Sequence, residues 1–169
     1  MRTKLLTLCL TLLAALTARA ADLDLTDVKD DAAATARLGV FLKDIGQEIV
    51  KQGSESVLIR NGNFSMFVYP TLSQKGGDLL VATIAFKGVG KSNLDAAPLT
   101  KALTQANSRF NYMTAYLDAE GDLVLRYSLV FDGKLGEALA KKWLLRIASQ
   151  STKFVKDHGE TLKPYLAKK

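Results

Sequence analysis

The chain has 169 residues, 48% of them hydrophobic, and its 23 basic and 17 acidic residues give a formal net charge of +6 at pH 7. This length is enough for one domain with a substantial core. The chain contains one histidine and one cysteine, which disfavours Ser-His-Asp and Cys-His catalysis as well as histidine or thiolate metal sites.

The first 20 residues have the three parts of a secretory signal peptide. A basic start at residues 2–4 precedes an uncharged apolar run at residues 5–16 and a small-x-small tripeptide that ends at Ala20. An apolar run of about 12 residues is too short for a membrane anchor, which needs about 20. We therefore expect cleavage between Ala20 and Ala21, export to the periplasm or the medium, and no transmembrane span in the mature chain.

Removal of this leader changes the composition. It leaves 149 residues with 20 basic and 17 acidic side chains, a net charge of +3, and no cysteine. Stability must then come from packing rather than from disulfides, and a modest charge on an exported chain disfavours nucleic-acid binding. We expect a flexible acidic lead-in at residues 21–31 and a single domain at residues 32–169.

The domain is expected to begin with an amphipathic helix at residues 32–52, because apolar residues recur at three- and four-residue spacing and Gly53 follows as a stop. Three strands follow, at residues 56–60, 64–69 and 79–87. Asn61-Gly62 predicts a tight hairpin between the first two. The third strand is apolar on both faces, which predicts a central strand that is covered on both sides.

The next helix begins after Asp95 as its cap, with Pro98 in its first turn. It ends where Asn107, Arg109 and Asn111 follow one another at two-residue spacing. These three side chains are candidate partner-binding residues. Backbone capping of the helix end is the competing interpretation.

Alternation at residues 112–118 and 123–131 predicts an antiparallel hairpin with a half-buried face, closed by a Gly-containing turn. A long helix is expected from about Leu135, with one broad apolar stripe that includes Trp143. Together with the third strand, this helix is expected to supply a contact surface, with Trp143 as a candidate partner-binding residue. The terminal Lys168 and Lys169 could give weak contact with an anionic membrane surface.

No residue is predicted to be catalytic, to hold a cofactor or to bind a metal. The loop at residues 88–92 has the Gly-Lys-Ser order of a phosphate-binding loop but lacks the glycine that the motif requires at position 85. His158 is expected on the apolar stripe of the last helix, near Asp157 and Glu160, at the boundary between core and solvent. Four carboxylates cluster around the ends of the hairpin, where carboxylates commonly form turns: Asp118, Glu120, Asp122 and Asp132.

The predicted order α-βββ-α-ββ-α is an α+β fold, an antiparallel sheet of about five strands with helices packed on it. With this order, four motifs carry a family resemblance: FLKDIG at residues 41–46, FVY at 67–69, ALTQAN at 102–107 and AYLDAEGDLVL at 115–125. The chain resembles the YbjN-like family of proposed bacterial sensory-transduction regulators, whose fold is similar to that of type III secretion chaperones. The chain departs from the family in its export leader and in the absence of cysteines at residues 73–77.

The resemblance implies a protein-binding module, often dimeric through its sheet and helices, and it implies no catalytic residue. We therefore expect an exported, non-enzymatic chaperone, adaptor or regulator of the bacterial cell envelope that binds another protein or a second copy of itself. A carrier of an apolar small molecule or lipid, held between the last helix and the sheet, is the alternative. A carboxylate-based hydrolase is a more distant one.

Overall fold

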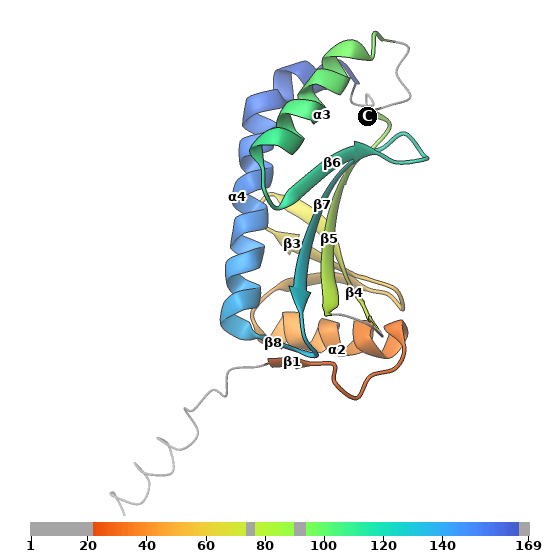
Figure 1. Ribbon diagram of the computed structural model, residues 1–169, viewed down its shortest axis with the longest axis vertical. Helices are drawn as coiled ribbons and strands as arrows, with labels where there is room; N and C mark the ends of the chain where they lie inside the picture. The colour runs from red at the N-terminus through yellow and green to blue at the C-terminus, as the bar shows by residue number, and fades with distance from the viewer. Residues whose placement is uncertain (1–21, 74–76, 90–93, 166–169) are drawn as a thin grey trace, which may run out of the picture.

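The computed structural model describes residues 22–73, 77–89 and 94–165 (Figure 1). The predicted leader with its cleavage position between Ala20 and Ala21, and the terminal Lys168 and Lys169, lie outside the described residues. Within the described ranges, no helix is long and apolar enough to cross a membrane.

Six strands form one antiparallel sheet in the order β2-β3-β4-β5-β7-β6. They are β2 (Glu48–Gln52), β3 (Val57–Asn61), β4 (Phe64–Thr71), β5 (Asp78–Phe86), β6 (Met113–Leu117) and β7 (Leu123–Phe131). Two short strands, β1 (Asp22–Asp24) and β8 (Lys134–Gly136), pair separately. The helices are α2 (Asp31–Asp44), α3 (Ala97–Arg109) and α4 (Glu137–Leu162), and the 3₁₀ turn η2 (Lys163–Tyr165) follows α4. The fold is α+β, as predicted, and the main sheet has one strand more than expected.

The additional strand comes from the second part of the helix that was predicted at residues 32–52. The helix α2 ends at Asp44, and Gly46 takes a φ of 86°. The Gly46 N–H donates to the Lys43 carbonyl at 3.0 Å and the Gln47 N–H to the Leu42 carbonyl at 2.9 Å, which is the Schellman arrangement that closes a helix. Residues after Gly46 then pair with β3 as an edge strand, so the prediction of one long helix was wrong.

Residues 21–31 were predicted as a flexible lead-in, and the structure of residues 22–31 differs. Leu23 and Leu25 are buried, because β1 pairs with β8 and places Leu23 opposite Leu135. The Asp30 carboxylate accepts a hydrogen bond from the Ala33 N–H at 2.8 Å and caps α2. The acidic composition indicated a mobile segment, but two leucines in it belong to the core.

Both predicted hairpins are present. Asn61 pairs with Phe64 around Gly62, which has a φ of 60°. The turn between β6 and β7 is closed by Asp118, whose N–H donates to the Asp122 carbonyl and whose carboxylate accepts from the Asp122 N–H. The expected central strand is also confirmed, since β5 lies between β4 and β7.

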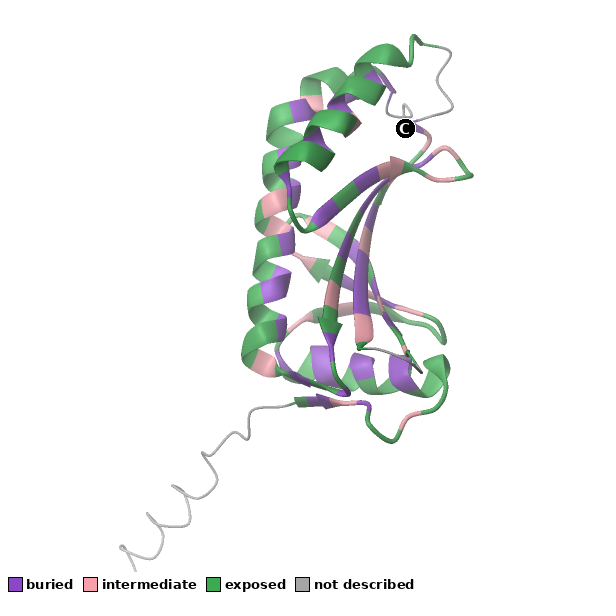
Figure 2. Ribbon diagram, in the orientation of Figure 1, coloured by how far each residue is buried: buried purple, intermediate pink, exposed green. Residues whose placement is uncertain are grey.

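The three helices pack on one face of the main sheet. The core cluster joins residues of α2, α3 and α4 to alternate residues of the strands, such as Val68, Ala82 and Tyr127, and contains none from the other face. In Figure 1, α4 runs along one side of the strands, and α3 and α2 lie near opposite ends of it. Figure 2 shows buried and exposed residues alternating in the middle of β7, whereas β5 is buried or half-buried, with Ala85 as its one exposed residue.

Candidate functional site

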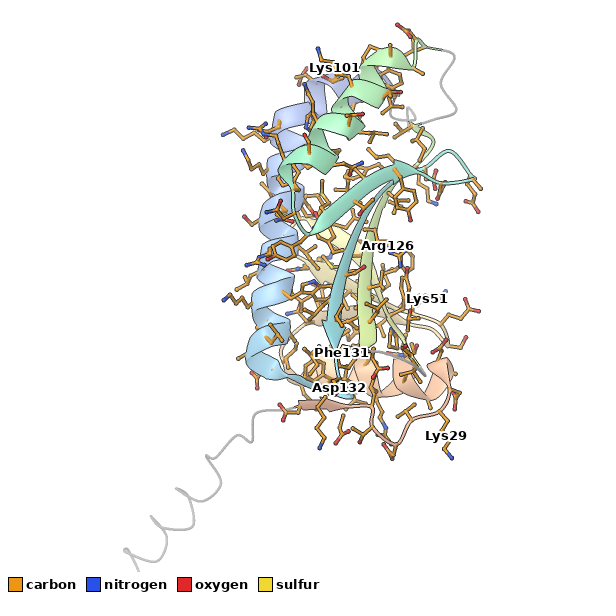
Figure 3. The ribbon with its side chains drawn as sticks, in the orientation of Figure 1. Lys29, Lys51, Lys101, Arg126, Phe131 and Asp132 are labelled. Carbon is orange, nitrogen blue, oxygen red and sulfur yellow. The ribbon has the colours of Figure 1, made fainter. Side chains whose placement is uncertain are left out.

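The face of the main sheet that carries no helix is the candidate functional site, and we call it the open face. Its middle row follows from the strand register. Lys51 of β2 lies opposite Leu58 of β3, and the row continues through Phe67 of β4, Thr83 of β5 and Arg126 of β7 to Thr114 of β6. Figure 3 shows Lys51 and Arg126 on the side of the sheet away from α4.

Apolar side chains on the open face remain in contact with solvent. Phe67 is 45% exposed and Val130 is 66% exposed, whereas Tyr69 and Leu79 are half-buried. Val81 of β5 is fully buried although it lies outside the core cluster. The prediction that β5 is covered on both sides therefore holds for this residue, but not for the face as a whole.

The charges of the open face are mostly positive. At its outer edge Arg60 lies 3.6 Å from Glu48, a pair that is exposed to solvent. Lys51 and Arg126 are exposed, and neither forms an ion pair with any residue that the structure describes. Lys51, Leu58 and Phe67 border a hollow of about 190 Å³ with the turn at residues 53–56, which includes Glu55. The open face thus combines exposed apolar surface with available cations.

The predicted partner-binding residues lie elsewhere, at the contact of α3 and α4 with β6. Trp143 is only 6% exposed, so its indole belongs to the core and cannot contact a partner from this position. Asn107 uses its side chain for the edge strand β6: its amide donates to the Ala115 carbonyl at 3.0 Å, and its oxygen accepts from the Ala115 N–H at 2.7 Å. A structural role for Asn107 is therefore favoured over partner binding. Its hydrogen bonds are made to the strand β6 and not to the end of the helix.

Arg109 and Asn111 are also separate from the open face. The Arg109 guanidinium donates to the Asp157 carboxylate at 3.2 Å and so joins α3 to α4. Lys153 shares the same carboxylate, and its hydrogen bond, together with the positive charges of Lys153 and Arg109, holds the pKa of Asp157 below its ordinary value. Asn111 lies exposed in the turn before β6. The four predicted residues do not form one site.

The carboxylates of the hairpin are separated by the length of β7. Asp118, Glu120 and Asp122 lie in the β6–β7 turn, and Asp132 lies beyond the opposite end of β7 (Figure 3). Asp122 is buried and holds the segment after β5, since it accepts from the Lys87 ammonium at 2.5 Å and from the Gly88 N–H at 2.7 Å. Asp132 therefore cannot face the turn carboxylates across a cleft.

His158 lies in α4 and is buried against the ring of Phe154, with 5.2 Å between the ring centroids. Burial lowers the pKa of His158 below its ordinary value, whereas the nearby Asp157 carboxylate acts in the opposite direction. Among the residues that the structure describes, no group of three or more His, Cys, Asp or Glu side chains could hold a metal ion.

The surface hollows among the described residues include three that α4 does not line. The largest, of about 700 Å³, has a mixed lining with Lys29, Asp30, Asp78 and Asp132 among its residues. The Asp78 carboxylate accepts from the Ser73 and Gly133 N–H groups at 3.0 and 3.3 Å, so it has a local structural role there. This polar lining does not suit an apolar ligand.

Sequence reasoning identified only part of the open face. The alternation in β4 placed Phe67 and Tyr69 opposite Met66 and Val68, but nothing local shows which face the helices cover. Lys51 was assigned to a helix, so its place in the row could not be predicted.

No protein-family model matches the chain, and no curated protein matches it either. A solved structure is similar to it: the crystal structure of YbjN, a proposed transcription regulator from E. coli. The two share 16% sequence identity with a TM-score of 0.53, and the similarity covers 74% of this chain and 90% of that chain. The chain therefore has a YbjN-like fold, as its motifs and element order predicted. At this identity the similarity shows the fold alone.

Proposed function

We propose that the chain is a non-enzymatic protein-binding module that acts as a chaperone, adaptor or regulator in the bacterial cell envelope, and that its partner binds the open face. The observation that carries this proposal is the exposed apolar surface around Phe67 on a sheet whose other face is fully used by three helices. Exposed apolar surface of this kind is typical of protein-interaction sites. The YbjN-like fold supports it, because a regulator or adaptor is a reasonable role for such a fold.

Export is part of this proposal. The three-part leader at residues 1–20 supports it, and the mature chain then functions without a cysteine in an oxidising compartment. Native mass spectrometry of the protein recovered from the periplasmic fraction tests this step. A mass that begins at Ala21 supports export, and a full-length mass in the cytosol contradicts it.

The binding surface is tested by photocrosslinking in the living cell. A photoreactive phenylalanine analogue replaces Phe67 in one variant and Leu145 in the other. Leu145 is a matched control because it is 70% exposed and lies on α4, away from the open face. We expect a crosslink to one polypeptide at position 67 and none at position 145, with the polypeptide then identified by mass spectrometry.

The identified polypeptide is purified and its binding to the wild type and to Phe67→Ser is measured. A loss of affinity of tenfold or more in Phe67→Ser supports the open face as the binding surface. Equal crosslinking at both positions, or unchanged affinity, contradicts it. A lipid or small-molecule adduct at position 67 in place of a polypeptide would favour the carrier alternative.

A further inference from the structure

The charge of the open face restricts the partner that it accepts. Its strands carry three cations, Lys51, Arg60 and Arg126, and one carboxylate, Glu48, which lies next to Arg60. A second carboxylate, Glu55, belongs to the turn beside Lys51. Lys51 and Arg126 thus have no ion-pair partner among the described residues, and Glu55 lines the same hollow as Lys51. A partner that covers them without an acid would remove two cations from water uncompensated, which is costly.

The two cations lie in one row on either side of apolar surface. Leu58, Phe67 and Thr83 stand between them, on β3, β4 and β5. Four strand-to-strand steps of about 4.8 Å place the backbones of Lys51 and Arg126 roughly 19 Å apart. A complementary ligand therefore has two acids at this separation and apolar side chains between them.

The chain itself does not supply such a ligand. The segments outside the described residues, 1–21, 74–76, 90–93 and 166–169, contain no Asp or Glu. A second copy docked face to face would bring Lys51, Arg60 and Arg126 of one copy against those of the other, with Glu48 already next to Arg60 and Glu55 confined to the turn beside Lys51. The occupant must therefore be another, acidic molecule.

The backbone of the open face constrains the conformation of the occupant. The four inner strands, β3, β4, β5 and β7, have neighbours on both sides, so their ladder hydrogen bonds are directed within the sheet. An extended segment that lies flat on the face would leave its own backbone groups buried without partners. A helix satisfies these groups internally, and helices are the usual cover of a sheet face.

We infer that the open face binds an acidic amphipathic helix of another protein, with two carboxylates that contact Lys51 and Arg126 and an apolar stripe that packs on Leu58 and Phe67. This inference rests on the proposed function and adds the chemistry of the partner. In such a helix the two acids are about 11 residues apart, because 11 residues rise about 17 Å and return to the same side. The long side chains of Lys51 and Arg126 span the remaining distance.

The test uses the mature protein and three designed helical peptides with the same apolar stripe. One peptide has Glu at both positions 11 residues apart, the second has Gln and the third has Lys. Binding is measured by fluorescence anisotropy at low and at moderate salt. We expect the Glu peptide to bind at least tenfold more tightly than the Gln peptide, the Lys peptide to bind most weakly, and salt to weaken only the Glu peptide.

Charge variants of the protein identify the cations involved. Arg126→Gln and Lys51→Gln are each expected to weaken binding of the Glu peptide about five- to tenfold and to leave the Gln peptide unchanged. Lys142→Gln is the matched control, because it removes the same charge from the exposed side of α4. Circular dichroism verifies that each variant is folded.

The outcomes separate this inference from the proposed function. If the Glu, Gln and Lys peptides bind the wild type equally and Phe67→Ser abolishes their binding, the open face binds partners. The inference that the partner is acidic is then wrong. If the Glu peptide does not bind at millimolar concentration, the inference is also wrong. If Phe67→Ser binds every peptide as tightly as the wild type, the open face is not the binding surface and both proposals fail.

Discussion

The two faces of the six-stranded sheet use the same strands in opposite ways. On the helix-covered face, Val57, Val68, Ala82, Tyr127 and Met113 form a row across five strands in which every residue is buried. One residue along each strand, the row through Phe67 and Arg126 on the open face contains no fully buried side chain. This difference indicates that the helix-covered face stabilises the fold, whereas the open face remains available for contact with a partner.

The largest expected change in the free energy of unfolding comes from Phe154, for which Phe67 is the comparison. Phe154 of α4 is fully buried between the sheet and its helix, and its ring lies near Phe86 and His158. Phe154→Ala should lower the free energy of unfolding by about 3–5 kcal/mol, through lost burial and a cavity. Phe67→Ala on the open face should lower it by less than about 1 kcal/mol. Urea unfolding of both variants measures the difference, and similar losses would contradict the assignment of the two faces.

A smaller change in the free energy of unfolding is expected from the buried hydroxyl pair of Tyr127 and Ser151. The Tyr127 hydroxyl lies 2.8 Å from the Ser151 hydroxyl, and burial raises the pKa of Tyr127 to about 12. Tyr127→Phe should lower the free energy of unfolding by about 1–2 kcal/mol, because it removes this buried hydrogen bond and leaves Ser151 without that partner. Tyr116→Phe on the open face is the control and should change stability by less than about 0.5 kcal/mol. Equal effects in urea unfolding would argue against the buried hydrogen bond.

A pH-dependent effect is expected at His158. Burial lowers the pKa of His158 in the folded chain below its unfolded value of 6.5, so the neutral ring is favoured by folding. Its contribution is complete above pH 6.5 and is lost as the pH falls below that value, because the unfolded chain takes up the proton first. Asp157 and Arg109 lie near this ring and act in opposite directions.

Urea unfolding at pH 7 and pH 5 measures this dependence in the wild type and in His158→Gln. The variant should lose less stability than the wild type over this interval, since glutamine does not titrate. Carboxylates with lowered pKa values, such as Asp157, titrate below pH 3.8 and do not contribute to this interval. A free energy of unfolding of the wild type that increases from pH 7 to pH 5 would contradict a histidine that is neutral in the folded chain.

The smallest change in the free energy of unfolding is expected for a charged residue of the open face. Arg126 is exposed and has no ion-pair partner among the described residues. Arg126→Ala should therefore change the free energy of unfolding by less than about 0.5 kcal/mol. A loss of more than 1 kcal/mol in urea unfolding would mean that Arg126 stabilises the fold, which would weaken the case for a role in binding.

Much of the fold could be predicted because its signals are local. The turn residues Gly62 and Gly121 have positive φ values at the predicted hairpins, and the stripe through Trp143 and Phe154 is buried as its spacing indicated. The end of α2 could not be predicted in this way. Ile45 and Ile49 are four residues apart, so a helix that stops at Gly46 and a helix that continues give the same apolar pattern.

The candidate site depends on long-range register, which the sequence does not show. Lys51 and Arg126 lie in one row only because β2, β3, β4, β5 and β7 pair in that order. Trp143 was a reasonable candidate for a contact surface, because tryptophan is common at interfaces. Its burial follows from the position of α4 across the sheet, and this position is also a tertiary property.

The pairing of β1 with β8 has a consequence for the order of events in folding. Leu23 reaches its buried position only when Leu135 is present as its partner, and these residues belong to the first and the last strand that the structure describes. Contacts between such distant segments form late, since closing a long loop costs entropy before the contact stabilises it. Burial of Leu23 is therefore expected to follow the formation of the main-sheet hairpins, whose partner residues are close in the sequence.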